Sequence, residues 1–448
     1  MRKPLAKKFL GNTSWLMAQN IYSMLLSIVI GSLSARYLGP SNYGVLGYGT
    51  SLVTLFVSIS KLGLDSVVIN ELVIKPEKKG DYIGATLIMR LVASIISVIG
   101  ISLLVLIIEP GNELLLKVTF FQSLAIIFQI HETFNYWFQT ELKSKYFVMS
   151  SIIGLTITGI WRIYLLYSGA SVEWFALSTS IQALVVLIMS ATIFRKIAQL
   201  KLSAYFSDMK YLLSRSHHFI IASISVAIYM QTDKIFLGKM IGQEAVGIYT
   251  AAMTIAMLWV FVPNAVINSA MPLIISEREK RYDEFIKRQK ALMLVITILG
   301  VIAGVIVLIF GKIAILILYG NAYNQSIVTL NILIWSTSLS ILGTSINIWI
   351  VAEGLNIYQK YMVFTGAIVN FLANLIMIPL IGINGAALAT FFSQFVVQFI
   401  APLLFKRTRP ILRIYLESFT MINRKNAKLA FSMLKTIRSR NKIGDKAS

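Results

Sequence analysis

Long apolar stretches recur along the whole chain and are separated by short polar segments. Many of them approach or exceed eighteen residues, the length at which an α-helix spans the hydrocarbon core of a bilayer. Two of them, the seventh and eighth, are weaker because they contain many small and polar positions. The pattern predicts twelve spanning helices, at about residues 13–35, 45–62, 83–108, 114–138, 146–168, 172–194, 217–237, 246–272, 291–311, 326–350, 361–381 and 384–405.

The composition supports an all-α polytopic membrane protein. Of 448 residues, 57% are hydrophobic and 13% are charged, whereas a soluble domain carries roughly 25% charged residues. If the N-terminus is cytoplasmic and the spans alternate, most of the 41 Lys and Arg fall in cytoplasmic segments, as the positive-inside rule requires. The net charge of +22 therefore indicates topology and attraction to anionic membrane lipids rather than to nucleic acid. Both termini are expected in the cytoplasm.

Motifs for bond chemistry are missing from the sequence. No G-x-x-x-x-G-K-[ST] occurs, “HETFN” at 131–135 lacks the second histidine of a zinc protease motif, and there are no cysteines. The predicted outer loops are too short to hold the two substrates of a membrane glycan polymerase or ligase. We expect no enzyme, no metal site and no cofactor, which leaves a pore or a transporter.

Polar side chains gather within several of the predicted spans, among them the fourth and the eleventh. Gln129, His131 and Glu132 lie in the fourth span, and Asn370 and Asn374 lie in the eleventh. One interpretation is close helix packing, with amides hydrogen-bonded between helices. The other is a water-filled cavity, which the combined polarity of the fourth span favours.

Basic residues also occur within or close to the spans. Arg90 and Arg162 lie inside the third and fifth spans, while Arg36 and Lys234 lie near the predicted outer ends of the first and seventh. An arginine at the centre of a lipid-facing helix costs ~2.5–3.5 kcal/mol on insertion scales. Snorkelling towards the interface lowers that cost. The alternative is an inward-facing cationic site, where a guanidinium binds phosphate through two parallel hydrogen bonds.

Acidic residues in the same regions are candidates for ion coupling. Three roles are open for Asp65, Glu132 and Asp233: each could be a member of an ion pair, a proton carrier or a sodium ligand. Because the chain has no ATP-binding motif, directional transport would use a proton or sodium gradient, or removal of the product outside. Structural pairing is the alternative for each carboxylate.

A repeated motif divides the predicted spans into two halves. Leu38-Gly39 aligns with Leu237-Gly238, and with four extra residues in the second connection “YGVLGYG” at 43–49 aligns with “VGIYTAA” at 246–252. Each copy connects the first and second helix of six, a common transporter plan of two parallel repeats. The predicted domains are an N-terminal lobe, a cytoplasmic linker, a C-terminal lobe and a basic tail, at 1–196, 197–216, 217–405 and 406–448.

We call the two aligned Leu-Gly segments the repeated corners. Together with the arginine of the third span and “LYGNAYNQS” at 318–326, they resemble the polysaccharide flippases. That family belongs to the multidrug/oligosaccharidyl-lipid/polysaccharide exporter superfamily, and the most similar type is the O-antigen or capsule repeat-unit flippase. The resemblance covers about residues 1–405 and implies two six-helix lobes related by pseudo-two-fold symmetry, V-shaped around a central cationic cavity. Its motif positions in this chain are Arg36, Asp233 and Lys234.

The function implied by this resemblance is transport of a lipid-linked glycan. Undecaprenyl-diphosphate-linked oligosaccharide would move from the inner to the outer leaflet of the bacterial cytoplasmic membrane by alternating access, with a polymerase and a chain-length regulator as further partners. An ion-coupled multidrug exporter, a lipid II flippase and a non-transporting scaffold protein are the alternatives. The candidate cavity residues are Arg36, Arg90, Arg162, Lys234, Gln129, His131, Glu132, Asn370 and Asn374.

Overall fold

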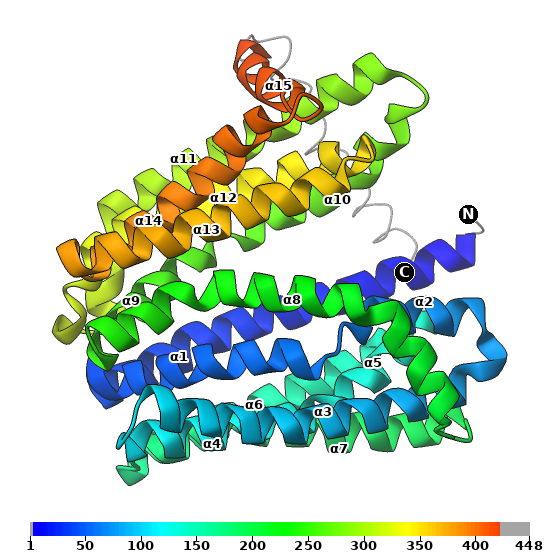
Figure 1. The fold of residues 1–448 in the computed structure, drawn as a ribbon, viewed down its shortest axis with the longest axis horizontal. Helices are drawn as coiled ribbons and strands as arrows, with labels where there is room; N and C mark the ends of the chain where they lie inside the picture. The colour runs from blue at the N-terminus through cyan, green and yellow to red at the C-terminus, as the bar shows by residue number, and fades with distance from the viewer. Residues whose placement is uncertain (1–2, 422–448) are drawn as a thin grey trace. The chain divides into compact units, whose positions relative to one another are not determined.

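The protein is built from α-helices. A computed structural model describes residues 3–421, and over that range every regular element is a helix and none is a strand (Figure 1). The helices up to the middle of the chain are α1 (Lys3–Ser60), α2 (Leu64–Ile74), α3 (Lys79–Ile108), α4 (Glu113–Phe128), α5 (Glu132–Thr140), α6 (Ser144–Ser168), α7 (Val172–Ala198), α8 (Phe206–Met240) and α9 (Gln243–Leu258). The later helices are α10 (Phe261–Arg278), α11 (Tyr282–Leu318), α12 (Ser326–Ala352), α13 (Asn356–Ile381), α14 (Ile383–Phe395) and α15 (Pro410–Ser418).

Most of these helices have the length and composition of membrane spans. Over the described residues, ten helices are long and apolar enough to cross a membrane. The helices α9 and α10, bent by 44° relative to each other, make an eleventh span if the pair is counted as one. The helix α1 has 58 residues and carries the first two predicted spans as two arms that run back alongside each other (Figure 1). Large aliphatic side chains such as Ile107, Ile160 and Leu380 are highly exposed, as expected where lipid replaces water. The predicted all-α polytopic membrane fold is confirmed.

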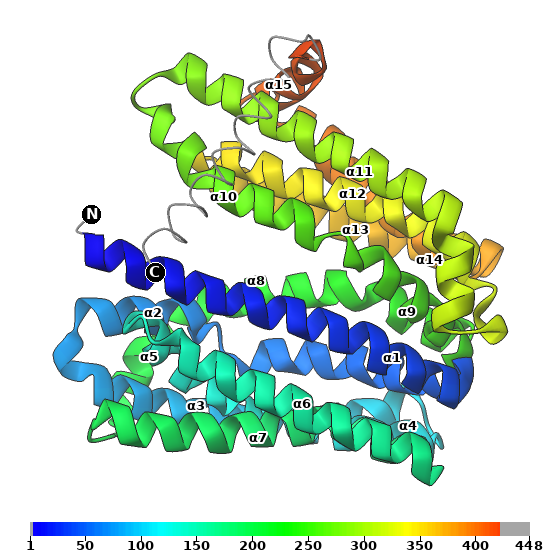
Figure 2. The same ribbon diagram turned by 180° about the vertical axis from the view of Figure 1, so that it is seen from behind.

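A single residue makes the turn between the two arms of α1. Gly39 has φ 70° and ψ 169°, a backbone region that is open essentially to glycine alone. Pro40 follows at the start of the second arm, where its missing N–H leaves no helical bond unmade. The first arm lies along α6, with 2.6 Å between Tyr22 Oη and Thr156 Oγ1 (Figure 2). The corner expected from the sequence is thus a one-residue turn.

The two repeated corners contact each other. A Cβ atom added to Gly44 would lie 1.7 Å from the carbonyl oxygen of Gln243, and one added to Gly247 would lie 2.0 Å from the carbonyl oxygen of Pro40. The repeat alignment pairs Gly44 with Gly247. The two close approaches therefore belong to one reciprocal contact, in which each glycine lies against the backbone of the other corner. Only glycine allows the helix backbones to approach so closely. We call this contact the glycine pair.

Contacts along the chain define two compact units, Met1–Thr250 and Ala251–Ser448. The boundary lies within α9, whereas the repeat placed a linker at 197–216; the repeat-based division stays a prediction. Two features place α8 in the first unit. It packs along α1, and the segment before it is docked, because Cβ atoms on Gly80 and Gly84 would lie 2.2 Å from the carbonyl oxygens of Lys201 and Ser203.

The described part of the second unit includes, near residue 421, an element that the sequence did not predict. After α14 the chain continues as a π-helical turn, Val396–Ile400, and a 3₁₀ turn, Ala401–Leu404. The basic tail then forms α15, whose Ile411 and Ile414 are buried in a core shared with α11 and α12. The remainder of the predicted tail, after Met421, lies outside the described residues.

Candidate functional site

Charged side chains of the first unit meet between the end of α1 and the helices α2, α3 and α5. Arg90 of α3, with 1% of its side chain exposed, donates from Nη1 to Tyr136 Oη at 2.8 Å and from Nη2 to Glu132 Oε2 at 3.0 Å. Lys61 Nζ lies 3.2 Å from the same carboxylate oxygen and 3.9 Å from Asp65 Oδ2. Tyr136 donates its hydroxyl proton to Asp65 Oδ1. These five side chains form the Arg90 cluster.

Two irregular backbone segments position the cluster. Between α1 and α2, Leu62 and Gly63 both have positive φ, and this reversal keeps Lys61 and Asp65 beside each other. Between α4 and α5, the 3₁₀ turn Gln129–His131 interrupts the fourth predicted span. Glu132 therefore begins a new helix, and its carboxylate faces α3.

The cluster contains two cations and two carboxylates, so its formal charges balance. Removing one partner of a buried ion pair is strongly unfavourable, because it leaves an uncompensated charge. As it stands, the cluster has no surplus positive charge with which to bind an anion. Arg90 would be released towards an anion only if the Glu132 carboxylate were neutralised.

Polar atoms beside the cluster lack protein partners. Gln129 Oε1, His131 Nδ1 and Asn135 Oδ1 are buried, and none has a hydrogen bond within the described part of the chain. Buried polar atoms of this kind are normally satisfied by water or a ligand. Over residues 3–421, no three His, Asp or Glu side chains are grouped so that they could hold a metal ion.

The remaining candidates of the first unit lie elsewhere. Arg36 is exposed on α1 three residues before the Gly39 turn, and Arg162 is half-buried on α6. On α8, Asp233 is buried and accepts a 2.6 Å hydrogen bond from Tyr249 Oη, while Lys234 is half-buried. The structure therefore brings together only some of the predicted residues, namely Arg90, Glu132, Asp65, His131 and Gln129.

Asn370 and Asn374 belong to the second unit. Both are buried on α13, and Asn374 Nδ2 donates to the carbonyl oxygen of Asn370 at 2.9 Å. This bond lies within one helix, so it does not hold two helices together.

A second buried carboxylate was not predicted. Glu71 of α2, 1% exposed, accepts from Arg215 Nη1 at 2.7 Å and from Tyr211 Oη at 3.2 Å, and lies 3.5 Å from Lys75 Nζ. Hydrogen bonds to Tyr211 and Tyr82 raise the pKa of Lys75 above its ordinary value. The contacts connect α2 with α8. The four-residue spacings of Glu71 to Lys75, and of Lys61 to Asp65, were sequence signals of such pairing.

Comparison with known families identifies the chain. A family model described as “Polysaccharide biosynthesis protein” matches residues 9–277, more than half of the sequence. The chain belongs to this family. The matched region includes both repeated corners and the whole Arg90 cluster, so the resemblance inferred from those residues is confirmed at the level of the family.

A named relative is similar to part of this chain. The protein named “Probable flippase AglR”, from Haloferax volcanii, is 31% identical over 178 residues, which cover 37% of this chain and 36% of the relative. The match thus spans about a third of that relative's length.

Two solved structures match nearly the whole chain. A structure of the lipid II flippase MurJ in an inward closed conformation covers 97% of this chain and 100% of its own, at 13% identity and a TM-score of 0.66. An inward-facing multidrug resistance MATE family transporter of the MOP superfamily covers 88% and 96%, at 12% identity and 0.64. At these identities the likeness shows the fold alone. This member of the polysaccharide biosynthesis family therefore shares its fold with a lipid II flippase and with a multidrug resistance transporter.

Proposed function

We propose that the protein is a flippase for undecaprenyl-diphosphate-linked glycan repeat units. It moves them from the inner to the outer leaflet of the bacterial cytoplasmic membrane by alternating access, for synthesis of O-antigen, capsule or exopolysaccharide. The observation that carries this proposal is the family match over residues 9–277 in a helical chain with buried charges among its spans. The name of the partial relative AglR points in the same direction.

The physical task explains the need for polar groups inside the spans. Burying an ionised group in hydrocarbon without partners costs many kcal/mol, and sugar hydroxyls add to that cost. In the proposal, a hydrated cationic cavity replaces these lost contacts while the isoprenoid chain stays in lipid. Its candidate lining remains the predicted set: Arg36, Arg90, Arg162, Lys234, Gln129, His131, Glu132, Asn370 and Asn374.

The Arg90 cluster is proposed as the switch in this cavity. Three atoms of Gln129, His131 and Asn135 have no hydrogen bond among residues 3–421, which suggests a place for water or a polar ligand beside Arg90. Neutralising Glu132 with a proton, or screening it with sodium, would free part of the guanidinium for a phosphate. Asp65 and Glu132 are therefore proposed for ion coupling, and Asp233, held by Tyr249, is a separate candidate. Proteoliposome transport that is indifferent to both proton and sodium gradients would exclude this coupling.

The glycine pair is proposed as the outer contact that opens and closes. If the corners lie on the outer side and belong to different lobes, parting Gly44 from Gly247 opens the cavity outwards. At Gly44 and Gly247 the contact is backbone against backbone, and beside it the buried Val246 packs over Gly47, so parting the corners would expose Val246. A polysaccharide polymerase and a chain-length regulator are proposed as partners on that side, with both termini in the cytoplasm.

The test is the position of the lipid-linked repeat unit in cells without the protein. Deletion is expected to leave the repeat unit on the inner leaflet, and the wild-type gene should restore export. Arg36→Ala and Arg90→Ala, at normal membrane abundance, are expected to reproduce the block. Lys117→Ala changes a lysine that is 58% exposed and pairs with the exposed Glu113, and it should restore export fully.

Two outcomes would overturn the proposal. Unchanged glycan export in the deletion strain, with export of drugs or of lipid II lost, would reassign the substrate to one of the alternatives. Full activity of both arginine variants would remove these side chains from the mechanism.

A further inference from the structure

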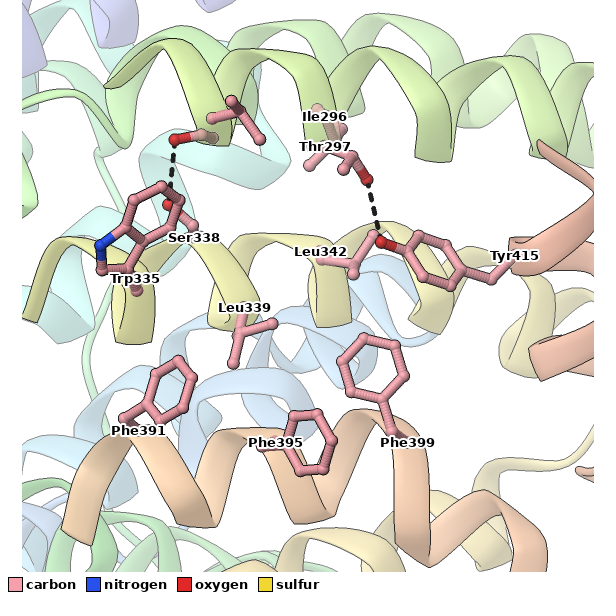
Figure 3. Close-up of a pocket in the computed structure, with 12 residues that line it drawn as sticks. Ile296, Thr297, Trp335, Ser338, Leu339, Leu342, Phe391, Phe395, Phe399 and Tyr415 are labelled. Carbon is pink, nitrogen blue, oxygen red and sulfur yellow. Dashed lines mark hydrogen bonds between the residues drawn. The ribbon is translucent and has the colours of Figure 1, made fainter. Parts of the chain in front are cut away.

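The second unit contains an apolar cavity of about 360 Å³ between α11, α12, α14 and α15 (Figure 3). Phe391, Phe395 and Phe399 line one side at intervals of four residues, and Trp335 and Leu339 of α12 lie opposite. The π-helical turn Val396–Ile400 carries Phe399. The cavity is thus an aromatic slot within a bundle of membrane spans.

Two glycines of α11 lie against α12 beside the slot. Gly304 lies against the Trp335 ring, where an added Cβ would approach to 2.5 Å, and Gly300 lies against Ser338 in the same way at 3.1 Å. Trp335 is therefore held against α11, and the room between α11, α12 and α14 stays open.

The lining excludes polar occupants. It contains no charged residue, and its few polar groups include the hydroxyls of Thr297 and Tyr415, which lie 3.5 Å from each other, and of Ser338, which lies 3.5 Å from the Gly300 carbonyl oxygen. Water needs two to four polar partners to occupy a cavity, whereas cavities lined by such residues stay dry and take hydrocarbon. At roughly 30 Å³ for each water-sized group, the slot has room for about twelve methylene-sized groups. In a membrane the abundant hydrocarbon of that form is a lipid chain.

The helix that closes the slot has the character of an interfacial helix. Tyr415 projects from α15 into the slot (Figure 3), while Leu416 and Phe419 are exposed. The same segment carries four exposed cations, Lys406, Arg407, Arg409 and Arg413, and one acidic residue, Glu417. Exposed apolar side chains beside basic ones are typical of a helix that lies in the headgroup region and attracts anionic lipid.

We propose that this slot, which we call the α15 slot, binds one acyl chain of an anionic phospholipid, whose phosphate is held by Arg409 and Arg413. Arg409 donates its Nε–H to the carbonyl oxygen of Leu403 at 2.9 Å, and Arg413 donates its Nε–H to Glu417 at 2.7 Å. Each bond orients a guanidinium whose terminal N–H groups suit a phosphate. The site lies in the second unit and does not depend on the substrate proposed above.

The test uses the full chain in nanodiscs and the fluorescence of Trp335. Lipids with brominated acyl chains quench a tryptophan that they touch, and the difference between the wild type and Trp335→Phe isolates this one residue. Brominated phosphatidylglycerol is expected to quench Trp335 in preference to brominated phosphatidylcholine, both diluted into plain phosphatidylcholine. Replacing both arginines, Arg409→Gln with Arg413→Gln, should lower that preference roughly tenfold or more, because each cation near the surface favours anionic lipid.

A filled slot provides the control for lipid that merely surrounds the protein. Leu339→Phe enlarges a lining side chain and should remove most Trp335 quenching, while quenching of the other tryptophans and the melting temperature stay unchanged. Equal quenching by both headgroups, or quenching that survives Leu339→Phe, would overturn the proposal. Displacement of the anionic phospholipid by a polyprenyl phosphate at equal concentration would also overturn it, since the slot would then take an isoprenoid chain.

Discussion

Replacing Gly44 by alanine is expected to force apart the two repeated corners. The added Cβ would lie 1.7 Å from the Gln243 carbonyl oxygen, 2.6 Å from its carbonyl carbon and 2.9 Å from the Gly247 nitrogen. All three are backbone atoms, so no side-chain rotation relieves the clash. Since real Cβ atoms essentially never approach closer than 3.0 Å, α9 or the second arm of α1 must move.

The cost follows from overpacking and is partly offset by helix propensity. Forcing an extra carbon into a packed contact costs typically 1–3 kcal/mol, while alanine in place of a helical glycine gains about 1 kcal/mol. Gly31→Ala measures that gain in the same helix, because nothing lies within 4 Å of its added Cβ. We therefore expect Gly44→Ala to be about 1–3 kcal/mol less stable than Gly31→Ala.

Thermal unfolding of the purified chain in detergent, followed by intrinsic fluorescence, measures these differences. Gly247→Ala should cost about as much as Gly44→Ala, because its Cβ meets the Pro40 carbonyl oxygen at 2.0 Å. The double variant should cost less than the sum of the two, because one separation of the helices relieves both clashes. Additive costs, or single variants that melt like Gly31→Ala, would show that the two glycines do not form one contact.

Three further predictions concern the buried charges and the tail helix. Arg90→Met should lose about 3 kcal/mol of stability, because the Glu132 carboxylate loses a buried partner. Glu71→Gln should lose about 1–3 kcal/mol, since its hydrogen-bonded carboxylate is almost fully buried. Hydrogen bonds from Lys290 and Arg413 hold the pKa of Glu417 below its ordinary value. The ion pair of Glu417 with Lys290 of α11 therefore stabilises the docking of α15 at pH values above the ordinary glutamate pKa. This contribution is lost as the pH falls through the lowered pKa, which the hydrogen-exchange protection factors of the α15 amides would detect.

Matched variants separate these effects from general damage. Arg90→Lys keeps the charge but lacks the planar guanidinium whose two terminal nitrogens reach Tyr136 and Glu132 separately, so its loss should be intermediate. Glu113→Gln changes a carboxylate that is 83% exposed and should be neutral. Glu417→Gln should remove the pH dependence of the protection factors in α15. Wild-type stability of Arg90→Met or Glu71→Gln, or α15 protection factors that do not change with pH, would contradict the interpretation of the corresponding pair.

Much of the fold followed from local properties of the sequence. The lengths of the apolar stretches defined the spans, because only helices satisfy every backbone polar group in hydrocarbon. The Leu-Gly-Pro corner predicted the turn at Gly39, since its backbone conformation suits glycine alone. The observed helix boundaries differ from the predicted ones where polar residues interrupt the apolar pattern. The helix α8 begins at Phe206 rather than near residue 217, and the eighth predicted span is the bent pair of α9 and α10.

The site depended on contacts that no local pattern contains. Arg90 was visible as a charge within a span, but lipid, water and a carboxylate were all open as its surroundings. The structure places it against Glu132 and Tyr136, on a different helix. The α15 helix was missed because its short apolar pattern is stable only where Ile411 and Ile414 find the core of the second unit.

The sequence by itself determined that this protein crosses the membrane many times, where it turns at Gly39, and which charges lie among the spans. These properties depend on transfer from water to lipid and on the backbone freedom of single residues, both of which are local. Only the tertiary structure decided which charges pair, that Gly44 meets Gly247, and that an apolar slot lies beneath α15. Those properties depend on distances between segments far apart in the chain, which packing sets.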